Sequence, residues 1–104
     1  ILERDWKKLG PKLKEKIRIY CGDMDSYYLN NAVYLREEFL KNSKDPYYKG
    51  HIEYGNRYSH CWYGNHEIPA DIDRFTLIQR LAPEMMKHML KTAPPGADTS
   101  SWRY

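Results

Sequence analysis

Two residues of the sequence, Asp25 and His60, have the types and the order of an acid and a base that act together. Each follows a short strand-like segment, and one amphipathic helical segment separates them. A carboxylate that accepts a hydrogen bond from histidine Nδ1–H orients the ring and stabilises the imidazolium that forms when the ring takes a proton. One known chain order of the Ser/His/acid triad places the acid and then the histidine after the serine. We therefore expect Asp25 and His60 to be the last two members of such a triad.

The serine of that triad is not identifiable among these residues. No serine here lies in a Gly-x-Ser-x-Gly turn, which exposes the nucleophile between a strand and a helix. Ser59 adjoins His60, but neighbouring side chains on a loop rarely point at each other. We expect the nucleophile to lie upstream and the 104 residues alone to be inactive as a hydrolase. The serines present are Ser26, Ser43, Ser59, Ser100 and Ser101.

Each member of the pair also has a plainer interpretation. Asp25 or Ser26 can serve as the N-cap of the following helix, because a side-chain oxygen there accepts the first free backbone N–H groups. Asp23 is an alternative acid, nearer the strand. A lone histidine in an aromatic loop, such as His60, is more often structural than catalytic. The order of acid and histidine after successive strands favours the catalytic interpretation.

The segments around the pair predict a strand–helix–strand unit. Alternating apolar and polar residues indicate a strand over 16–21, and a helix is expected from the loop at 23–26 to about Lys41. A second strand is expected over 51–54. The whole unit of 39 residues has the size of a right-handed βαβ crossover between parallel strands. Loops beyond the carboxyl ends of such strands are where open α/β sheets bind ligands.

Helical segments are expected on both sides of this unit. The first should end near Leu9, where a Gly-Pro pair interrupts its periodicity. The last should begin at Asp73 and kink or break near Leu81, because Pro83 has no backbone N–H to donate. Residues 92–104 lack a core pattern and are expected to form a poorly structured tail.

The fold class predicted from these elements is α/β, with parallel strands at a sheet edge and flanking helices. Two short strands do not form an independently stable sheet. We therefore expect the sheet to extend beyond these residues, or the helices or another chain to supply the stability. The apolar stripe expected on the central helix comprises Tyr28, Leu29, Ala32, Val33, Leu35, Phe39 and Leu40.

Composition favours few other classes of function. The 17 basic and 14 acidic residues are dispersed, so the net charge of +3 predicts no nucleic-acid partner. No apolar stretch is long enough for a membrane span, and none is expected. Cys21 and Cys61 are too few for a disulfide framework and leave the cellular location open. No metal or cofactor is expected, because the possible ligands His51, His60, Cys61 and His66 lack paired spacing.

Aromatic residues surround the candidate pair in the sequence. They could line a cleft for an aromatic acyl group or a sugar, or they could pack the loops. The residues are Tyr27, Tyr28, Tyr58, Trp62 and Tyr63, of which Tyr27, Tyr58 and Trp62 are the expected substrate contacts.

Two stretches, Gly-Asp-Met-Asp-Ser-Tyr-Tyr-Leu-Asn-Asn-Ala at 22–32 and Tyr-Gly-Asn-Arg-Tyr-Ser-His-Cys-Trp at 54–62, resemble a known family. The resemblance covers roughly 12–91 and is to the C-terminal part of an esterase family of α/β-hydrolases. That family includes S-formylglutathione hydrolase, enterochelin esterase and relatives of feruloyl esterase. The motifs are short, and their order carries more weight than either motif singly.

This resemblance implies that the chain is the C-terminal segment of one α/β-hydrolase domain. Asp25 matches the acid position of the family and His60 its histidine position. The implied activity is hydrolysis of a small-molecule or carbohydrate ester, with the rest of the hydrolase domain as partner. The sequence departs from the family in lacking the nucleophile. A non-catalytic carbohydrate-binding or protein-binding module of the same ancestry is the alternative.

Overall fold

The computed structural model describes residues 1–67 and 77–100 of the chain. It has a mixed α/β architecture with a small parallel sheet, as the sequence predicts. No helix among the described residues is both long enough and apolar enough to cross a membrane. The elements are α1 (Trp6–Leu13), β1 (Arg18–Gly22), α2 (Leu29–Asn42), β2 (His51–Gly55), the π-helical turn η1 (Leu77–Leu81) and α4 (Ala82–Thr92).

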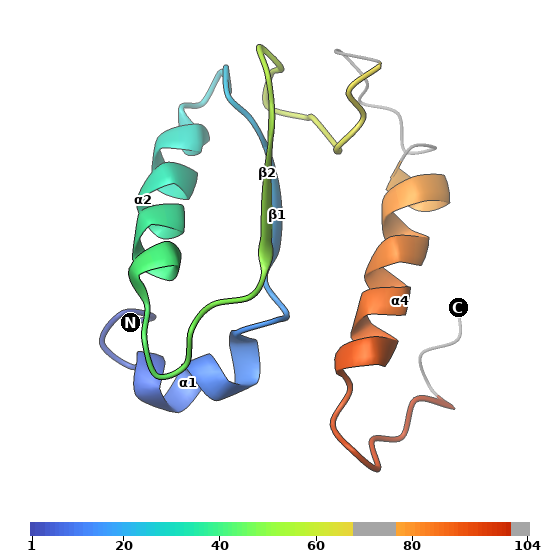
Figure 1. Cartoon of the computed structure of the whole chain (residues 1–104). Helices are drawn as coiled ribbons and strands as arrows, with labels where there is room; N and C mark the ends of the chain where they lie inside the picture. The colour runs from blue at the N-terminus through green and yellow to red at the C-terminus, as the bar shows by residue number, and fades with distance from the viewer. Residues whose placement is uncertain (68–76, 101–104) are drawn as a thin grey trace.

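The sheet positions the two loops of interest. β1 and β2 pair in parallel along their whole lengths, with Gly22 opposite Gly55 at their carboxyl ends. Figure 1 shows α2 on one side of the strands and α4 on the other. Because the two strands end at the same level, the loops that carry Asp25 and His60 leave the sheet at one edge. The predicted strands at 16–21 and 51–54 are thus confirmed with small shifts in their bounds.

The first helix is longer than the sequence predicts. α1 continues through Gly10 and Pro11 to Leu13, so the expectation that it ends near Leu9 is wrong. Pro11 removes one backbone donor from the helix, which ordinarily kinks or breaks it. Here the helix packs against a distant loop, and this packing outweighs the local preference.

Trp6 is the main contact between α1 and that loop. It is buried and donates its indole N–H to the backbone oxygen of Pro46 at 3.0 Å. Its ring meets Phe39 of α2 edge to face, with centroids 5.5 Å apart. Gly10 allows this approach, because a Cβ there would lie 2.7 Å from Pro46 Cδ and 2.9 Å from the indole.

The central helix begins later than expected. Its N-cap is Tyr28, in a left-handed conformation with φ of 58°, so neither Asp25 nor Ser26 is the N-cap. The Tyr28 N–H instead bonds the backbone oxygen of Asp25 at 2.9 Å, closing a turn before Leu29. The carboxylate of Asp25 accepts the backbone N–H of Tyr27 at 2.7 Å, within the turn that precedes the helix.

Only part of the expected stripe on α2 is buried. Leu40 is completely buried, and Val33 and Phe39 are half-buried. Leu35, by contrast, has 70% of its surface exposed. A sheet of two strands is too narrow to cover the whole apolar face of a helix, which explains why the remaining stripe residues are accessible.

The last helix changes type where proline interrupts it. The π-helical turn ends at Leu81, and α4 starts at Ala82 with Pro83 in its first turn. Pro83 has no N–H to donate to the helix, and it lies at the change from π-helical to α-helical bonding. Leu81 itself has helical angles, with φ of −72° and ψ of −42°, so the expected kink or break is seen here as a change of helix type and not as an interruption of the helix. The expected start at Asp73 lies outside the described residues.

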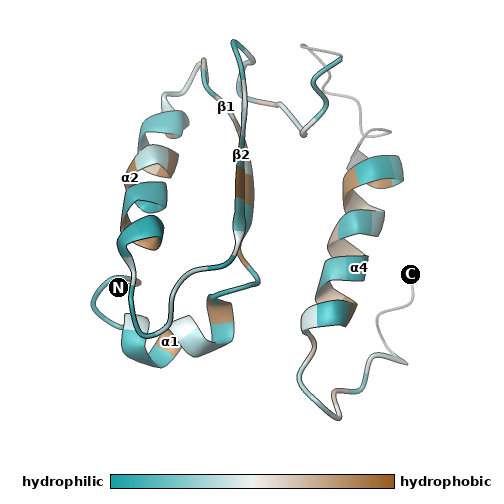
Figure 2. Cartoon of the chain, in the orientation of Figure 1, coloured by the Kyte–Doolittle hydropathy of each residue, from teal (hydrophilic) through white to brown (hydrophobic). Residues whose placement is uncertain are grey.

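The core is small. Figure 2 shows strongly apolar colour at the centre of the strands, between α2 and α4. α4 contributes no buried side chain and presents several exposed apolar residues instead. The buried apolar residues of the described part are Trp6, Cys21, Leu40, Trp62 and Leu81, and the exposed ones on α4 are Met85, Met86, Met89 and Leu90.

Leu40→Ala tests the importance of this core. Truncating a fully buried leucine removes apolar contacts and leaves a cavity, so the free energy of unfolding should fall by about 2–5 kcal/mol. Leu35→Ala, on the same helix but exposed, is the matched control and should change it by less than about 0.5 kcal/mol. Urea denaturation followed by circular dichroism measures both, and equal losses for the two variants would contradict the described packing of α2.

Candidate active site

Asp25 and His60 meet beyond the carboxyl ends of the strands. His60 Nδ1 lies 2.8 Å from Asp25 Oδ2, which is a hydrogen-bond distance. The side chain of Asp25 is 4% exposed and that of His60 38% exposed. The acid is therefore buried behind the imidazole, and the imidazole faces solvent.

The hydrogen bond also assigns the two ring nitrogens of His60. A carboxylate only accepts hydrogen bonds, so the proton lies on Nδ1 and Nε2 is the basic nitrogen of the neutral ring. Within residues 1–67 and 77–100, Nε2 makes no hydrogen bond. Such a ring can accept a proton from a nucleophile brought to its exposed edge.

Asp25 is held as a carboxylate by its surroundings. Burial raises the pKa of its carboxyl, but hydrogen bonds from His60 and from the backbone amides of Tyr27 and Leu29 outweigh this and leave the pKa below its usual value. The Tyr27 amide donates to Oδ1 at 2.7 Å. The side chain is thus negatively charged at neutral pH, as the partner of a catalytic histidine must be.

Tyr27 contacts both members of the pair. Besides its backbone bond to Asp25, its ring meets the His60 ring at a centroid distance of 4.7 Å and an interplanar angle of 70°. The ring is 70% exposed, so a face of it remains available. Of the three expected substrate contacts, Tyr27 is the one that touches the pair.

Tyr58 and Trp62 have a different environment. Trp62 is 5% exposed and donates its indole N–H to the backbone oxygen of Asn65 at 2.7 Å. Tyr58 is half-buried, packs on Trp62 with centroids 5.6 Å apart, and donates its hydroxyl to the backbone oxygen of His66. In the described structure these rings pack the loop that carries His60.

Glycines at both strand ends let this loop approach the sheet. A Cβ on Gly22 would lie 2.3 Å from the backbone oxygens of both Tyr58 and Ser59. A Cβ on Gly55 would lie 2.5 Å from the rings of Trp62 and Tyr58. The loop backbone thus crosses β1 at its last residue, immediately before His60.

A second polar cluster secures the far end of the loop. Glu53 of β2 accepts hydrogen bonds from His51 at 2.9 Å and from His66 at 2.6 Å. Burial raises the pKa of Glu53, but the bonds from the two histidines lower it by more, so its pKa lies below the usual value. Sequence analysis overlooked Glu53, although strand alternation places His51 and Glu53 on one face of β2.

Other possible nucleophiles and ligands are poorly placed. Burial raises the pKa of Cys21, and the negative charges of Asp25 and Asp23 raise it further, which disfavours a thiolate. Ser43 is buried and donates its hydroxyl to the backbone oxygen of Leu40, at the end of α2. In the part of the chain that the structure describes, no group of three or more potential ligands is arranged to hold a metal ion.

Comparison with known proteins provides no relative: no family model, no curated protein and no solved structure matches the chain.

The pH dependence of stability should reveal the charged state of Asp25. Its pKa is lower in the folded chain than in the unfolded chain, so the carboxylate stabilises the fold above the unfolded pKa of about 4. That contribution is lost as the pH falls through the lower, folded pKa. The difference in unfolding free energy between wild type and Asp25→Asn should therefore shrink from pH 6 to pH ~3. Urea denaturation at several pH values measures it, and a constant difference would be contrary evidence.

Gly22→Ala should separate His60 from Asp25. The new methyl group would overlap the backbone oxygens of Tyr58 and Ser59, so the loop must shift. We expect the ring ¹H–¹⁵N signals of His60 to lose the pattern of an Nδ1 proton bonded to a carboxylate. Gly96→Ala is the control: its φ of 78° strains an alanine locally, but a Cβ there has nothing within 4 Å and Gly96 lies in the segment after α4, remote from the site (Figure 1). Unchanged His60 signals in Gly22→Ala would refute the close approach.

Proposed function

We propose that the chain supplies the acid and the base of a serine esterase with an α/β-hydrolase fold. Asp25 is the acid, His60 is the general base, and the nucleophilic serine and oxyanion-hole amides come from a preceding segment. The substrate is a small-molecule or carbohydrate ester. The observation that carries the proposal is the bond between His60 Nδ1 and the buried carboxylate of Asp25, with the rest of the imidazole exposed.

In the proposed reaction, the serine oxygen attacks the ester carbonyl carbon as its proton moves to His60 Nε2. The resulting imidazolium donates two hydrogen bonds, and the one from Nδ1 is received by Asp25, which remains ionised. His60 then gives the proton to the departing alcohol oxygen as the ester C–O bond breaks. Water repeats the sequence at the acyl-serine, with its proton passing to His60 and on to the serine oxygen.

The burial of Asp25 supports this role in energetic terms. A charge pair contributes more when water is excluded from it. With the acid 4% exposed and fixed by the Tyr27 amide, the carboxylate need not reorganise when the imidazolium forms. An exposed pair would be weakened by solvent and would leave the ring free to rotate.

The small size of the sheet supports the proposal that further segments of the protein complete the fold. Parallel sheets are usually covered on both faces, and each edge strand leaves unpaired backbone groups. In the described part, β1 pairs with β2 alone, and α4 has an exposed apolar face. The remainder of a hydrolase domain would pair with β1 and supply the missing cover.

The alternative of a non-catalytic binding module has less support. Binding of sugar by the aromatic loop would require accessible rings, whereas Trp62 is buried and Tyr58 is half-buried against it. The accessible aromatic ring beside His60 is that of Tyr27, which belongs to the other loop.

His60→Ala in the complete encoded protein tests the proposal. Loss of the general base should lower kcat/KM for an aryl acetate by at least about 10³-fold. Asp25→Asn should lower kcat/KM by at least about 10²-fold. The neutral side-chain amide of asparagine neither stabilises the imidazolium of His60 nor keeps the proton of the neutral ring on Nδ1. His51→Ala is the control, because His51 is hydrogen-bonded to Glu53 and not to Asp25. This variant should retain activity within about threefold.

The assignment would be abandoned if His60→Ala kept activity within about tenfold of wild type. The 104-residue chain should show no labelling by a fluorophosphonate, because none of its serines lies in a Gly-x-Ser-x-Gly turn. Labelling of any of them would contradict the need for a serine from elsewhere.

A further inference from the structure

We propose that Asp23, two residues before the acid, is a positioning residue that holds the His60 loop over Asp25. This inference rests on the proposed function of the pair for its catalytic meaning. The contacts that carry it belong to the folded chain and can be tested without turnover.

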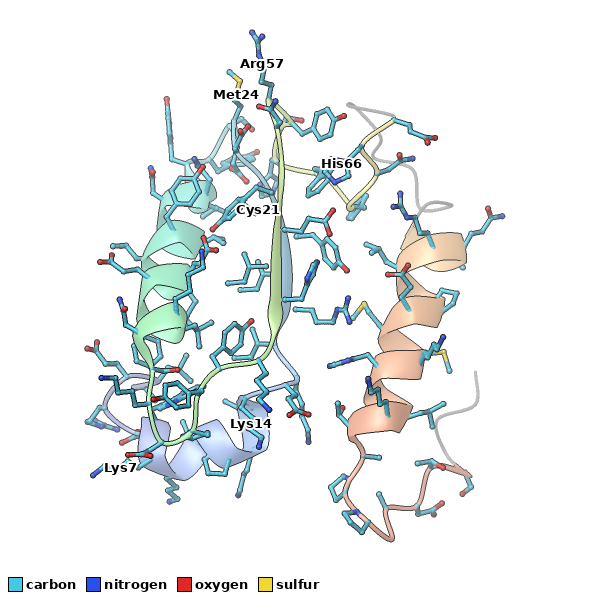
Figure 3. The ribbon with its side chains drawn as sticks, in the orientation of Figure 1. Lys7, Lys14, Cys21, Met24, Arg57 and His66 are labelled. Atoms are coloured by element: carbon cyan, nitrogen blue, oxygen red, sulfur yellow. The ribbon has the colours of Figure 1, made fainter. Side chains whose placement is uncertain are left out.

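Asp23 is bonded to the turn that ends β2. Its carboxylate Oδ1 accepts the backbone N–H of Arg57 at 2.5 Å, and its own N–H donates to the oxygen of Gly55 at 3.0 Å. The next residue, Met24, donates its N–H to the oxygen of Tyr58 at 3.1 Å. Figure 3 shows Met24 and Arg57 side by side beyond the strand ends. Three hydrogen bonds, two made by Asp23 and one by Met24, therefore join the two loops.

The turn needs such support because of its backbone conformation. Arg57 has φ of 62°, in the left-handed region that a non-glycine residue adopts at an energetic cost. The Tyr58 N–H bonds the oxygen of Gly55 at 3.2 Å and closes the turn. His60 follows three residues after Arg57, so relaxation of Arg57 toward an ordinary conformation would redirect the chain just before His60.

Asp23 also connects this turn to the central helix. The side-chain amide of Asn30 donates to the backbone oxygen of Asp23 at 3.0 Å. Asp23 thus bonds the end of β2, the His60 loop and the first turn of α2. Its carboxylate makes no hydrogen bond to His60 among the described residues, so the structure assigns it positioning and leaves Asp25 as the acid.

The test uses Asp23→Ala and Asp23→Asn in the ¹⁵N-labelled complete encoded protein, in which the sheet has its full cover. The Nδ1 proton of His60 is observed directly, because a proton bonded to a carboxylate resonates downfield and exchanges slowly with water. Asp23→Ala should lose this signal or exchange it at least about tenfold faster. Asp23→Asn keeps a side-chain oxygen that can accept the Arg57 N–H and should restore the signal.

Asp98→Ala is the matched control. Asp98 also accepts a backbone amide through its side chain, from Ser100 at 2.9 Å, but it lies near the C-terminus. This variant should leave the His60 signal unchanged. An Asp23→Ala chain with native circular dichroism and an unchanged Nδ1 signal would overturn the proposal, as would a folded Asp23→Asn chain that lacks the signal.

A second measurement needs no variant and covers the case in which Asp23→Ala does not fold. In the wild-type chain at low urea concentration, the Arg57 amide and the His60 Nδ1 proton should lose protection together. Nδ1 protection that persists after Arg57 has opened would overturn the proposal. Neither readout depends on ester hydrolysis. Failure of the proposed function would appear as activity retained by His60→Ala, whereas failure of the role of Asp23 would appear as an unchanged Nδ1 signal in Asp23→Ala.

Discussion

The parallel register of β1 and β2 is the constraint on which the candidate site depends. Gly22 lies opposite Gly55, so both strands end together and their loops start from neighbouring points. A shift of one residue would move one loop by about 3.3 Å along the sheet. The distance between His60 and Asp25, now 2.8 Å, would then exceed the range of a hydrogen bond. The same register places a residue without a side chain at each strand end, where the loop backbone crosses.

Much of this arrangement could be predicted from sequence because it depends on local patterns. Alternation identified the two strands, and the order of Asp25 and His60 after them was enough to expect that the residues meet. The start of α2 was not predictable in this way. Tyr28 adopts a left-handed conformation because a turn at Asp25 precedes the helix, and this turn depends on contacts from another loop.

The contacts that sequence analysis missed are those between distant residues. Asp23 bonds Arg57 across 34 positions, and Trp6 bonds Pro46 across 40. Periodicity contains no information on such pairs, so Asp23 could only be weighed as a substitute acid, and α1 was expected to stop at a glycine and a proline. The burial of Trp62 was equally hidden, because an aromatic residue in a loop can face a ligand or the core.

Two carboxylates separated by one residue have different environments because their neighbours differ. Asp25 accepts an imidazole N–H and is almost fully buried, whereas Asp23 accepts a backbone N–H at a partly exposed turn. A histidine changes its charge when it acts as a base, so its partner must tolerate both forms; a backbone amide is always a neutral donor. The charge of Asp25 is therefore essential to the role proposed for it, while the role proposed for Asp23 needs only an oxygen at the right position. This difference separates the proposed acid from the proposed positioning residue in a chain where both follow the same strand.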